Sequence, residues 1–252
     1  MPTNRINPNP IPRPKSQQVA TQSWLSVAKS YLLKGILYFL IGSVIWVVVL
    51  KFMPVWFTPH SVARKFEAIA DGRSSKIYSD WTSYDNISKE AALAVVASED
   101  QQFPNHWGMD FKAMNGAFKN NMRGKKIKGA STISQQVAKN VFLWHGRSYI
   151  RKILEVYFTV LIELIWGKER ILEVYLNIAE TGPMTFGVEA AAQRYYSKSA
   201  YELTRSEAAR IAAVLPSPLR FSIKNPSNYV NHRTAQIAQQ MRMLGRKYIA
   251  KL

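Results

Sequence analysis

The sequence contains no cysteine among its 252 residues, and its 16 acidic residues are outnumbered by 34 lysines and arginines. Without cysteine the protein cannot be a disulfide-stapled domain or an enzyme with a catalytic thiol. No glycine period is present, which excludes a collagen-like fibre. With 47% hydrophobic residues, the chain as a whole is too apolar to be disordered. The formal charge of +18 predicts an anionic partner: nucleic acid, an anionic membrane surface or a phosphorylated substrate.

The N-terminal part of the chain is expected to contain a tail and a membrane anchor. Residues 1–20 hold five prolines among polar residues, so we predict a disordered Pro-rich tail over residues 1–30. Sixteen residues without charge lie between Lys34 and Lys51. Because about 20 apolar residues cross a bilayer, residues 31–57 are predicted to form one transmembrane helix. Residues 58–252 are then a single further domain.

Two other interpretations of the apolar run compete with a membrane span. A cleaved signal peptide has a shorter leading region and a small-residue cleavage site, which the sequence does not offer. A buried core helix is normally shorter or amphipathic. Basic residues stand on both sides of the run, so the charge distribution leaves the orientation open.

Beyond residue 58 the sequence predicts a mainly α-helical domain. Ser88, Thr204 and Ser227 are expected to cap helices, Glu207 to complete a capping box with Thr204, and Pro216 to end that helix. Helical spacing of apolar residues is found in 89–100, 133–143, 148–166, 168–179 and 205–216, and from 228 to about 248. The best of few strand signals is the segment KIYSDW near residue 78.

Charge is concentrated in residues 111–154, which hold ten lysines and arginines and no acidic residue. Arg147 and Arg151 are four residues apart and would share one helical face, with Lys152 adjacent. One interpretation is a solvated basic face. The other is a converging set of cations, including Lys139, that binds a pyrophosphate where a leaving group develops negative charge.

Four carboxylates flank this basic stretch. Glu99 and Asp100 precede it, and Asp110 and Glu155 stand at its edges. Two carboxyl groups in a basic cleft could perform acid–base chemistry at a glycosidic centre. From spacing alone, however, an ion pair with Arg151 is the simpler explanation for Glu155. An exposed helix C-terminus is the simpler explanation for Glu99.

Five segments resemble, in order, the five signatures of the family 51 peptidoglycan glycosyltransferases. They are residues 99–110 (EDQQFPNHWGMD), 129–140 (GASTISQQVAKN), 151–155 (RKILE), the region 168–196 that begins KERILEVYLN, and 203–216 (LTRSEAARIAAVLP). One such segment would be weak evidence, but five in family order are specific. Ser134 and Tyr196 depart from the usual Thr and Phe without affecting a charged position. The chain ends soon after the fifth segment, so we expect no transpeptidase domain, as in the family's monofunctional members.

The resemblance implies a fold, a reaction and a set of site residues. The fold would be mainly α, lysozyme-like and two-lobed. The reaction would polymerise lipid II into β-1,4 glycan strands, with inversion and release of undecaprenyl pyrophosphate. Glu99 matches the family's general base, and Glu155 matches its second essential carboxylate. The implied substrate-binding residues are Asp100, Phe103, Gln136, Lys139, Asn140, Arg147, Arg151 and Lys152.

The resemblance also implies cofactors, partners and a location. We expect a divalent cation, Mg²⁺ or Mn²⁺, with unidentified ligands, and no organic cofactor. The expected partners are lipid II, the nascent glycan strand and membrane lipids, with other cell-wall synthases or division proteins and no nucleic acid. The domain would be periplasmic, on a single-pass anchor in a bacterial inner membrane. The lobe after the first signature would dip into the membrane through Phe111, Met114 and Phe118, unless these side chains are core.

Two other functions compete with this interpretation of the sequence. A lytic transglycosylase or lysozyme-like hydrolase also relies on a glutamate in a helical fold, but it has no pyrophosphate that would need the acid-free basic stretch. A membrane-anchored nucleic-acid-binding or scaffold protein would account for the charge alone. It would not require Glu99 and Glu155, and the sequence carries no helix-turn-helix, zinc or RNA-binding signature.

Overall fold

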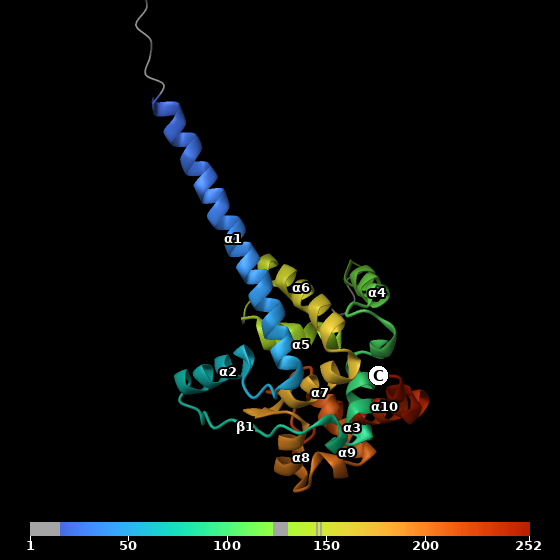
Figure 1. Cartoon of the computed structure of the whole chain (residues 1–252). Helices are drawn as coiled ribbons and strands as arrows, with labels where there is room; N and C mark the ends of the chain where they lie inside the picture. Colours follow the sequence, from blue (N-terminus) through green and yellow to red (C-terminus); the bar gives the residue numbers. More distant parts are fainter. Residues whose placement is uncertain (1–15, 123–130, 145, 147) are drawn as a thin grey trace, which may run out of the picture. The chain divides into compact units, whose positions relative to one another are not determined.

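The computed structural model describes residues 16–122, 131–144, 146 and 148–252, and it divides into two units, residues 1–46 and 47–252 (Figure 1). The described part of the first unit is helical and belongs to α1 (Ser16–Phe52). Within α1, the stretch Trp24–Phe52 is long and apolar enough to cross a membrane. The helix begins earlier than predicted, because residues 16–30 are helical rather than part of a disordered tail. Residues 1–15 lie outside the described part of the chain.

The second unit is mainly helical, which confirms the predicted fold class. Its helices are α2 (Pro59–Ala70), α3 (Lys89–Glu99), α4 (Phe111–Met122), α5 (Ile133–Phe142), α6 (Tyr149–Ile165), α7 (Lys168–Ile178), α8 (Val188–Tyr196), α9 (Arg205–Val214) and α10 (Asn228–Leu244). Short 3-10 turns cover Tyr84–Asn86, Phe103–Asn105, Ala200–Glu202 and Arg246–Lys251.

The predicted helix starts are present in the structure. The side chains of Ser88, Thr204 and Ser227 each accept a hydrogen bond from a backbone N–H in the first turn of the helix that follows. The last long helix, α10, ends at Leu244 rather than near residue 248. Gly245 follows with φ +74°, a conformation that ends an α-helix, and the chain continues as a 3-10 turn.

Helix α3 carries the first signature into the interior. It packs against α9, α10 and α7, and its residues Ala91–Ala97 are buried. A helix that is enclosed on several sides needs no polar face, which explains its small apolar residues on all sides. Helix α5 packs on α6 and α7 in the same way, through Ile133, Val137 and Ala138. The core therefore fixes the C-terminal end of α3 with respect to α5.

A small sheet lies beside the helices, in the order β1 (Tyr78–Ser79), β3 (Thr185–Phe186), β2 (Glu180–Gly182). Strand β1 pairs with β3 in parallel, and β2 pairs with β3 antiparallel. The strand predicted near residue 78 is confirmed. Strands β2 and β3 were not predicted, because two or three residues are too short to show an alternating pattern.

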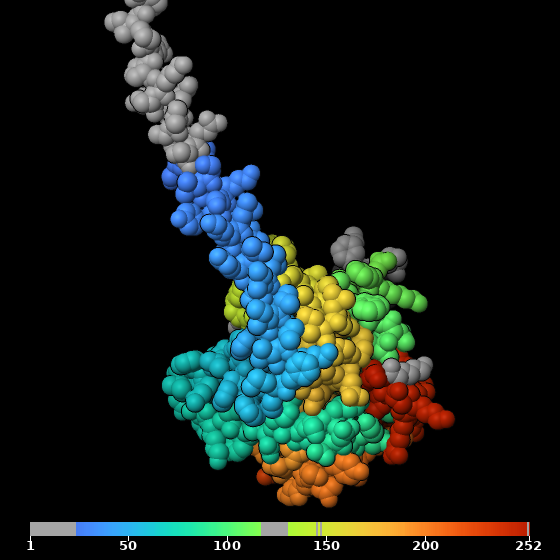
Figure 2. Space-filling model, viewed as in Figure 1, coloured from blue at the N-terminus to red at the C-terminus, as the bar shows by residue number. Residues whose placement is uncertain are grey.

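Helix α6 has an apolar face that the described residues leave uncovered. Ile150, Ile153 and Leu164 are each at least 65% exposed, although they recur at helical spacing. Figure 2 shows α6, in yellow, at the surface of the second unit. On α4, Phe111 is 69% exposed and is not a core residue, whereas Met114 is half-buried. The side chain of Phe118 lies outside the described residues.

The turn from β3 into α8 depends on Gly187. This residue has φ +85°, and a Cβ there would lie 2.6 Å from the backbone oxygen of Asn177. The Asn177 side chain in turn donates to the Thr82 carbonyl and accepts from the Thr82 N–H, both at 2.8 Å. These two hydrogen bonds hold the loop after β1 against the end of α7, and the close approach of Gly187 places the turn into α8 beside the same residue.

We predict that Gly187→Ala destabilises the protein by about 3 kcal/mol or more, because it adds a backbone collision to a left-handed conformation. Gly72→Ala is the matched control: Gly72 also has positive φ, but nothing lies within 4 Å of its Cβ position. The control should cost only about 1–2 kcal/mol. Denaturant unfolding of the full chain in detergent measures both. Equal losses would show that the approach to Asn177 has no energetic weight.

Candidate active site

Glu99 is the last residue of α3, and its carboxylate accepts a hydrogen bond from the Gln136 amide nitrogen on α5 at 3.0 Å. The Tyr175 hydroxyl on α7 donates to the Gln136 carbonyl oxygen at 3.3 Å. Burial raises the pKa of Glu99, while the Gln136 hydrogen bond and the charge of Arg233 act in the opposite direction. Burial also raises the pKa of Tyr175 well above its ordinary value, so this hydroxyl remains a donor. The site thus holds a carboxyl group that is oriented, weakly paired and suited to accept a proton.

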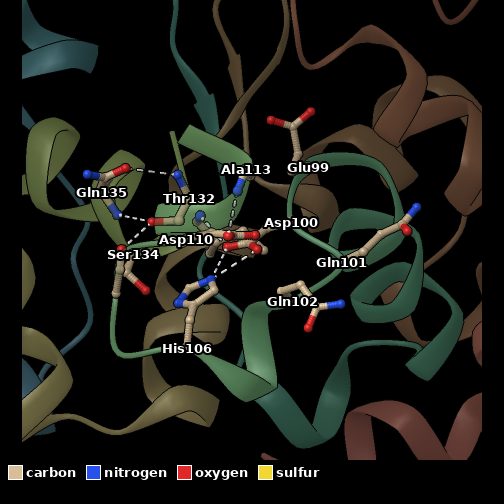
Figure 3. Close-up of polar contacts among 12 residues, drawn as sticks. Glu99, Asp100, Gln101, Gln102, His106, Asp110, Ala113, Thr132, Ser134 and Gln135 are labelled. Carbon is tan, nitrogen blue, oxygen red and sulfur yellow. Dashed lines mark hydrogen bonds and ion pairs between the residues drawn. The ribbon is translucent and has the colours of Figure 1, made fainter. Parts of the chain in front are cut away.

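Asp100 faces a different set of groups from Glu99. Figure 3 shows the Glu99 carboxylate pointing away from the cluster around Asp100 and His106. The Asp100 carboxylate accepts from the Ile133 backbone N–H, at the start of α5, at 3.1 Å and lies 2.9 Å from His106 Nε2. Asp100 is 6% exposed. Asp100 thus joins the first signature to the second, and its expected contact with a substrate stays a prediction.

Two hydroxyl groups of the second signature make further hydrogen bonds to other parts of the domain. Thr132 caps α5 and donates its hydroxyl to the Gly108 carbonyl at 2.6 Å. The Ser134 hydroxyl donates to Glu163 at 2.5 Å, and Lys168 reaches the same carboxylate at 2.7 Å. Ser134, the residue that stands in place of the usual Thr, therefore uses the hydroxyl that both share. Sequence reasoning did not identify Glu163 and Lys168 as partners of this region, because they lie some thirty residues away on other helices.

Phe103 is buried in this structure. It was expected to bind substrate, but its side chain has 0% exposure and belongs to the core. The Lys168 ammonium lies 4.5 Å from its ring centroid, which is within the range of a cation–π contact. Phe103 therefore supports the first signature from within the core, and its expected contact with a substrate stays a prediction.

A cavity of about 310 Å³ opens beside Gln136. It is lined by His60, Gln136, Lys139, Asn140, Leu143, Trp144, Gly146, Arg151, Tyr175, Ala179, Glu180, Leu215 and Pro218. Gln136, Lys139, Asn140 and Arg151, four of the predicted substrate-binding residues, are therefore brought together. Burial lowers the pKa of Lys139; the Glu155 charge opposes this, and Arg151 and Lys152 add to it.

Glu155 lies beneath the cationic wall of this cavity. It is 3% exposed, and its carboxylate lies 3.1 Å from Arg151 Nη1 and 2.5 Å from Lys152 Nζ. The ion pair expected from spacing is confirmed, in a buried setting. The Arg151 Nε is itself buried and has no hydrogen-bond partner within the described residues. Glu155 thus holds the Arg151 guanidinium, one of whose N–H donors makes no hydrogen bond within the described residues.

Three expected features are not assembled by the described residues. Lys152 is 47% exposed and does not line the cavity, although it pairs with Glu155. Arg147 lies outside the described part of the chain. No group of three or more His, Asp or Glu side chains in the described ranges could hold a metal ion. The carboxylate of Glu155 is occupied by two cations, so the donor groups seen here do not fit a protein-held metal site.

Comparison with known proteins places these residues in a family. A family model described as transglycosylase matches residues 65–242, which is more than half of the chain. The chain belongs to the transglycosylase family. This membership makes it a glycosyltransferase and accounts for the helical domain that surrounds the cavity.

Several curated relatives cover nearly the same length. A biosynthetic peptidoglycan transglycosylase of Pseudomonas savastanoi pv. phaseolicola is 50% identical over 85% of this chain and 91% of its own length. Proteins of the same name from Pasteurella multocida and Pectobacterium carotovorum subsp. carotovorum are each 48% identical. They cover 82% and 88% of this chain, and 84% and 91% of their own lengths.

We predict that Asp100→Asn destabilises the chain by about 2–4 kcal/mol, because it weakens two hydrogen bonds made by a buried charge. Asp110→Asn is the control, since Asp110 is half-buried and accepts one backbone bond, from the Ala113 N–H. It should cost about 1 kcal/mol or less. Unfolding free energies of both variants test the positioning role. If Asp100→Asn is as stable as the control, the joint between the two signatures carries no stability.

Proposed function

We propose that this protein is a peptidoglycan glycosyltransferase that polymerises lipid II into β-1,4 glycan strands. The observation that carries the proposal is the cavity lined by Lys139, Arg151 and Gln136, because the Gln136 amide also holds the Glu99 carboxylate. A proton acceptor next to a cationic wall suits a transfer in which a hydroxyl attacks and a pyrophosphate leaves. Family membership and the names of the relatives support the same substrate class.

In the proposed reaction the 4-hydroxyl of the acceptor's N-acetylglucosamine attacks C1 of N-acetylmuramic acid in the growing strand. The bond from C1 to the pyrophosphate oxygen breaks as the new bond from C1 to O4 forms. Glu99 accepts the hydroxyl proton, and undecaprenyl pyrophosphate leaves with the bonding electron pair. A single displacement inverts the α linkage to β and needs no covalent enzyme intermediate. Gln136 orients Glu99 through the hydrogen bond from its side-chain amide.

The cationic wall stabilises the leaving group. Lys139 and Arg151 contribute donors to the cavity, and charge-assisted bonds to phosphate oxygens are the strong kind. Glu155 holds Arg151 in place from below and is not free to act as a second base. Arg147 and Lys152 are proposed as further pyrophosphate contacts. A divalent cation remains part of the proposal, and the pyrophosphate oxygens themselves would supply ligands for it.

The location follows from the substrate. Lipid II is membrane-bound, so we propose that α1 anchors the chain once in the bacterial inner membrane with residues 58–252 in the periplasm. The exposed Phe111 on α4 and the apolar face of α6 are suited to shallow contact with lipids. Other cell-wall synthases and division proteins are proposed as partners.

The general-base assignment predicts that Glu99→Gln lowers the rate of lipid II polymerisation by roughly 10²–10⁴. Glutamine keeps the size of the side chain but cannot accept the proton. Since burial raises the pKa of Glu99, the parent's activity should fall as pH drops through a value above that of an ordinary carboxyl group. The measurement is a pH–rate profile on lipid II, with products separated by length.

Glu155→Gln is the comparison variant. It should also lose activity, through looser Arg151 and weaker substrate binding, while any residual activity keeps the acidic limb of the profile. A Glu99→Gln enzyme with near-parent turnover and an unchanged limb would move the base elsewhere. Absence of any lipid II polymerisation by the parent, with or without Mg²⁺ or Mn²⁺, would contradict the proposed function itself.

The pyrophosphate assignment predicts that Lys139→Ala weakens polymerisation tenfold or more, because a charge-assisted contact contributes about 1.5–3 kcal/mol. Lys224→Ala removes an equal charge from an exposed position that does not line the cavity, and it serves as the control. The measurement is initial rate against lipid II concentration for both variants. Equal rates for the two would show that overall positive charge, rather than the cavity, attracts the substrate.

A further inference from the structure

The cavity has a second polar wall that the reaction above does not use. His60, on α2, and Glu180, on β2, line it together with Trp144, which follows α5. None of the three belongs to the set of residues expected from the sequence. Trp144 is 50% exposed, so an aromatic face is available beside the two polar groups.

Behind this wall lies a buried arginine. Arg64 Nε is 3.3 Å from each carboxylate oxygen of Glu180, and His60 Nε2 is 3.4 Å from the same carboxylate. The side chains of Arg64 and Glu180 are 9% and 5% exposed, whereas His60 is 18% exposed. Arg64 also pairs with Glu67 on its own helix. Glu180 is therefore neutralised from behind, and His60 is the member of the cluster most accessible from the cavity.

We propose that His60, Glu180 and Trp144 form a saccharide subsite, which takes the uncharged N-acetyl sugar adjoining the pyrophosphate. This inference rests on the proposed function. Ring and carboxylate groups beside an exposed aromatic side chain offer hydrogen bonds to hydroxyl and amide groups and a flat apolar face for a sugar ring. The subsite would orient C1 of the sugar toward Glu99 while the cationic wall holds the phosphates.

Charge argues against two other occupants. A phosphate group would have to lie against the Glu180 carboxylate, whereas the opposite sign is offered by Lys139 and Arg151 in the same cavity. An ammonium group on the substrate's peptide would find the Glu180 charge already paired with Arg64. A neutral group rich in hydroxyls and amides fits both the paired carboxylate and the half-exposed indole.

The test compares ligands with and without the sugars and peptide of lipid II. Lipid II and a sugar-free polyprenyl pyrophosphate are titrated against the full chain in detergent, in a Glu99→Gln background that slows turnover. His60→Ala and Trp144→Ala should each weaken lipid II binding about three- to tenfold and leave the sugar-free ligand unchanged. Lys139→Ala should weaken both ligands. His232→Ala, which alters an exposed histidine on α10, is the matched control and should change neither.

The outcomes separate the alternatives. Equal losses for both ligands would mean that His60 only supports the cavity, and no loss for lipid II in either variant would also overturn the subsite. A third ligand is the lipid-linked disaccharide without its peptide, and both variants must lose affinity for it as they do for lipid II. If they bind it as well as the parent does, the residues of this wall contact the peptide rather than the sugar. If the unmodified chain binds neither ligand, the proposed function fails as well. Thermal melting of each variant shows whether it is folded. If His60→Ala does not fold, Trp144→Ala, which alters a half-exposed position, still tests the subsite.

Discussion

The hydrogen bond from the Ile133 N–H to the Asp100 carboxylate is the constraint on which the site depends. It joins the end of α3 to the start of α5, two elements that are separated by thirty-three residues in the sequence. Because Asp100 faces this joint, the preceding residue, Glu99, faces the other way and meets Gln136. One buried carboxylate is thereby committed to structure, and its neighbour is left for chemistry.

The two carboxylates that flank the cavity have different environments, and the difference assigns their roles. Glu99 has an amide as its direct partner, so burial dominates and raises its pKa. Glu155 has a guanidinium and an ammonium within 3.1 Å. A carboxylate that pairs with two cations holds both of them in position. The two environments therefore fit the proposed roles, with Glu99 as the base and Glu155 as a support for the cations.

Sequence patterns predicted the helices that combine a cap with a long apolar repeat, such as α3 and α9, because capping and burial act within a few residues. They missed α2, which begins with a capping box formed by Thr58 and Ser61. They also missed the short strands β2 and β3. The family signatures contain Gln136, Lys139 and Arg151, which line the cavity, and their binding of substrate stays a prediction. They could not distinguish Phe103, which is buried, from residues that reach the cavity, nor bring in His60 from another helix. Motifs report which residues matter, whereas exposure and distant contacts depend on the completed fold.

The cation cluster shows how the fold favours an anionic ligand. Burial and the charges of Arg151 and Lys152 lower the pKa of Lys139, which means that the protonated form is held at a cost. Among the described residues, Glu155 offsets that cost, and it already pairs with Arg151 and Lys152. A pyrophosphate in the cavity would bring two or more negative charges to Lys139 and Arg151. Binding would therefore relieve repulsion, and this relief would increase as the leaving group gains charge in the transition state.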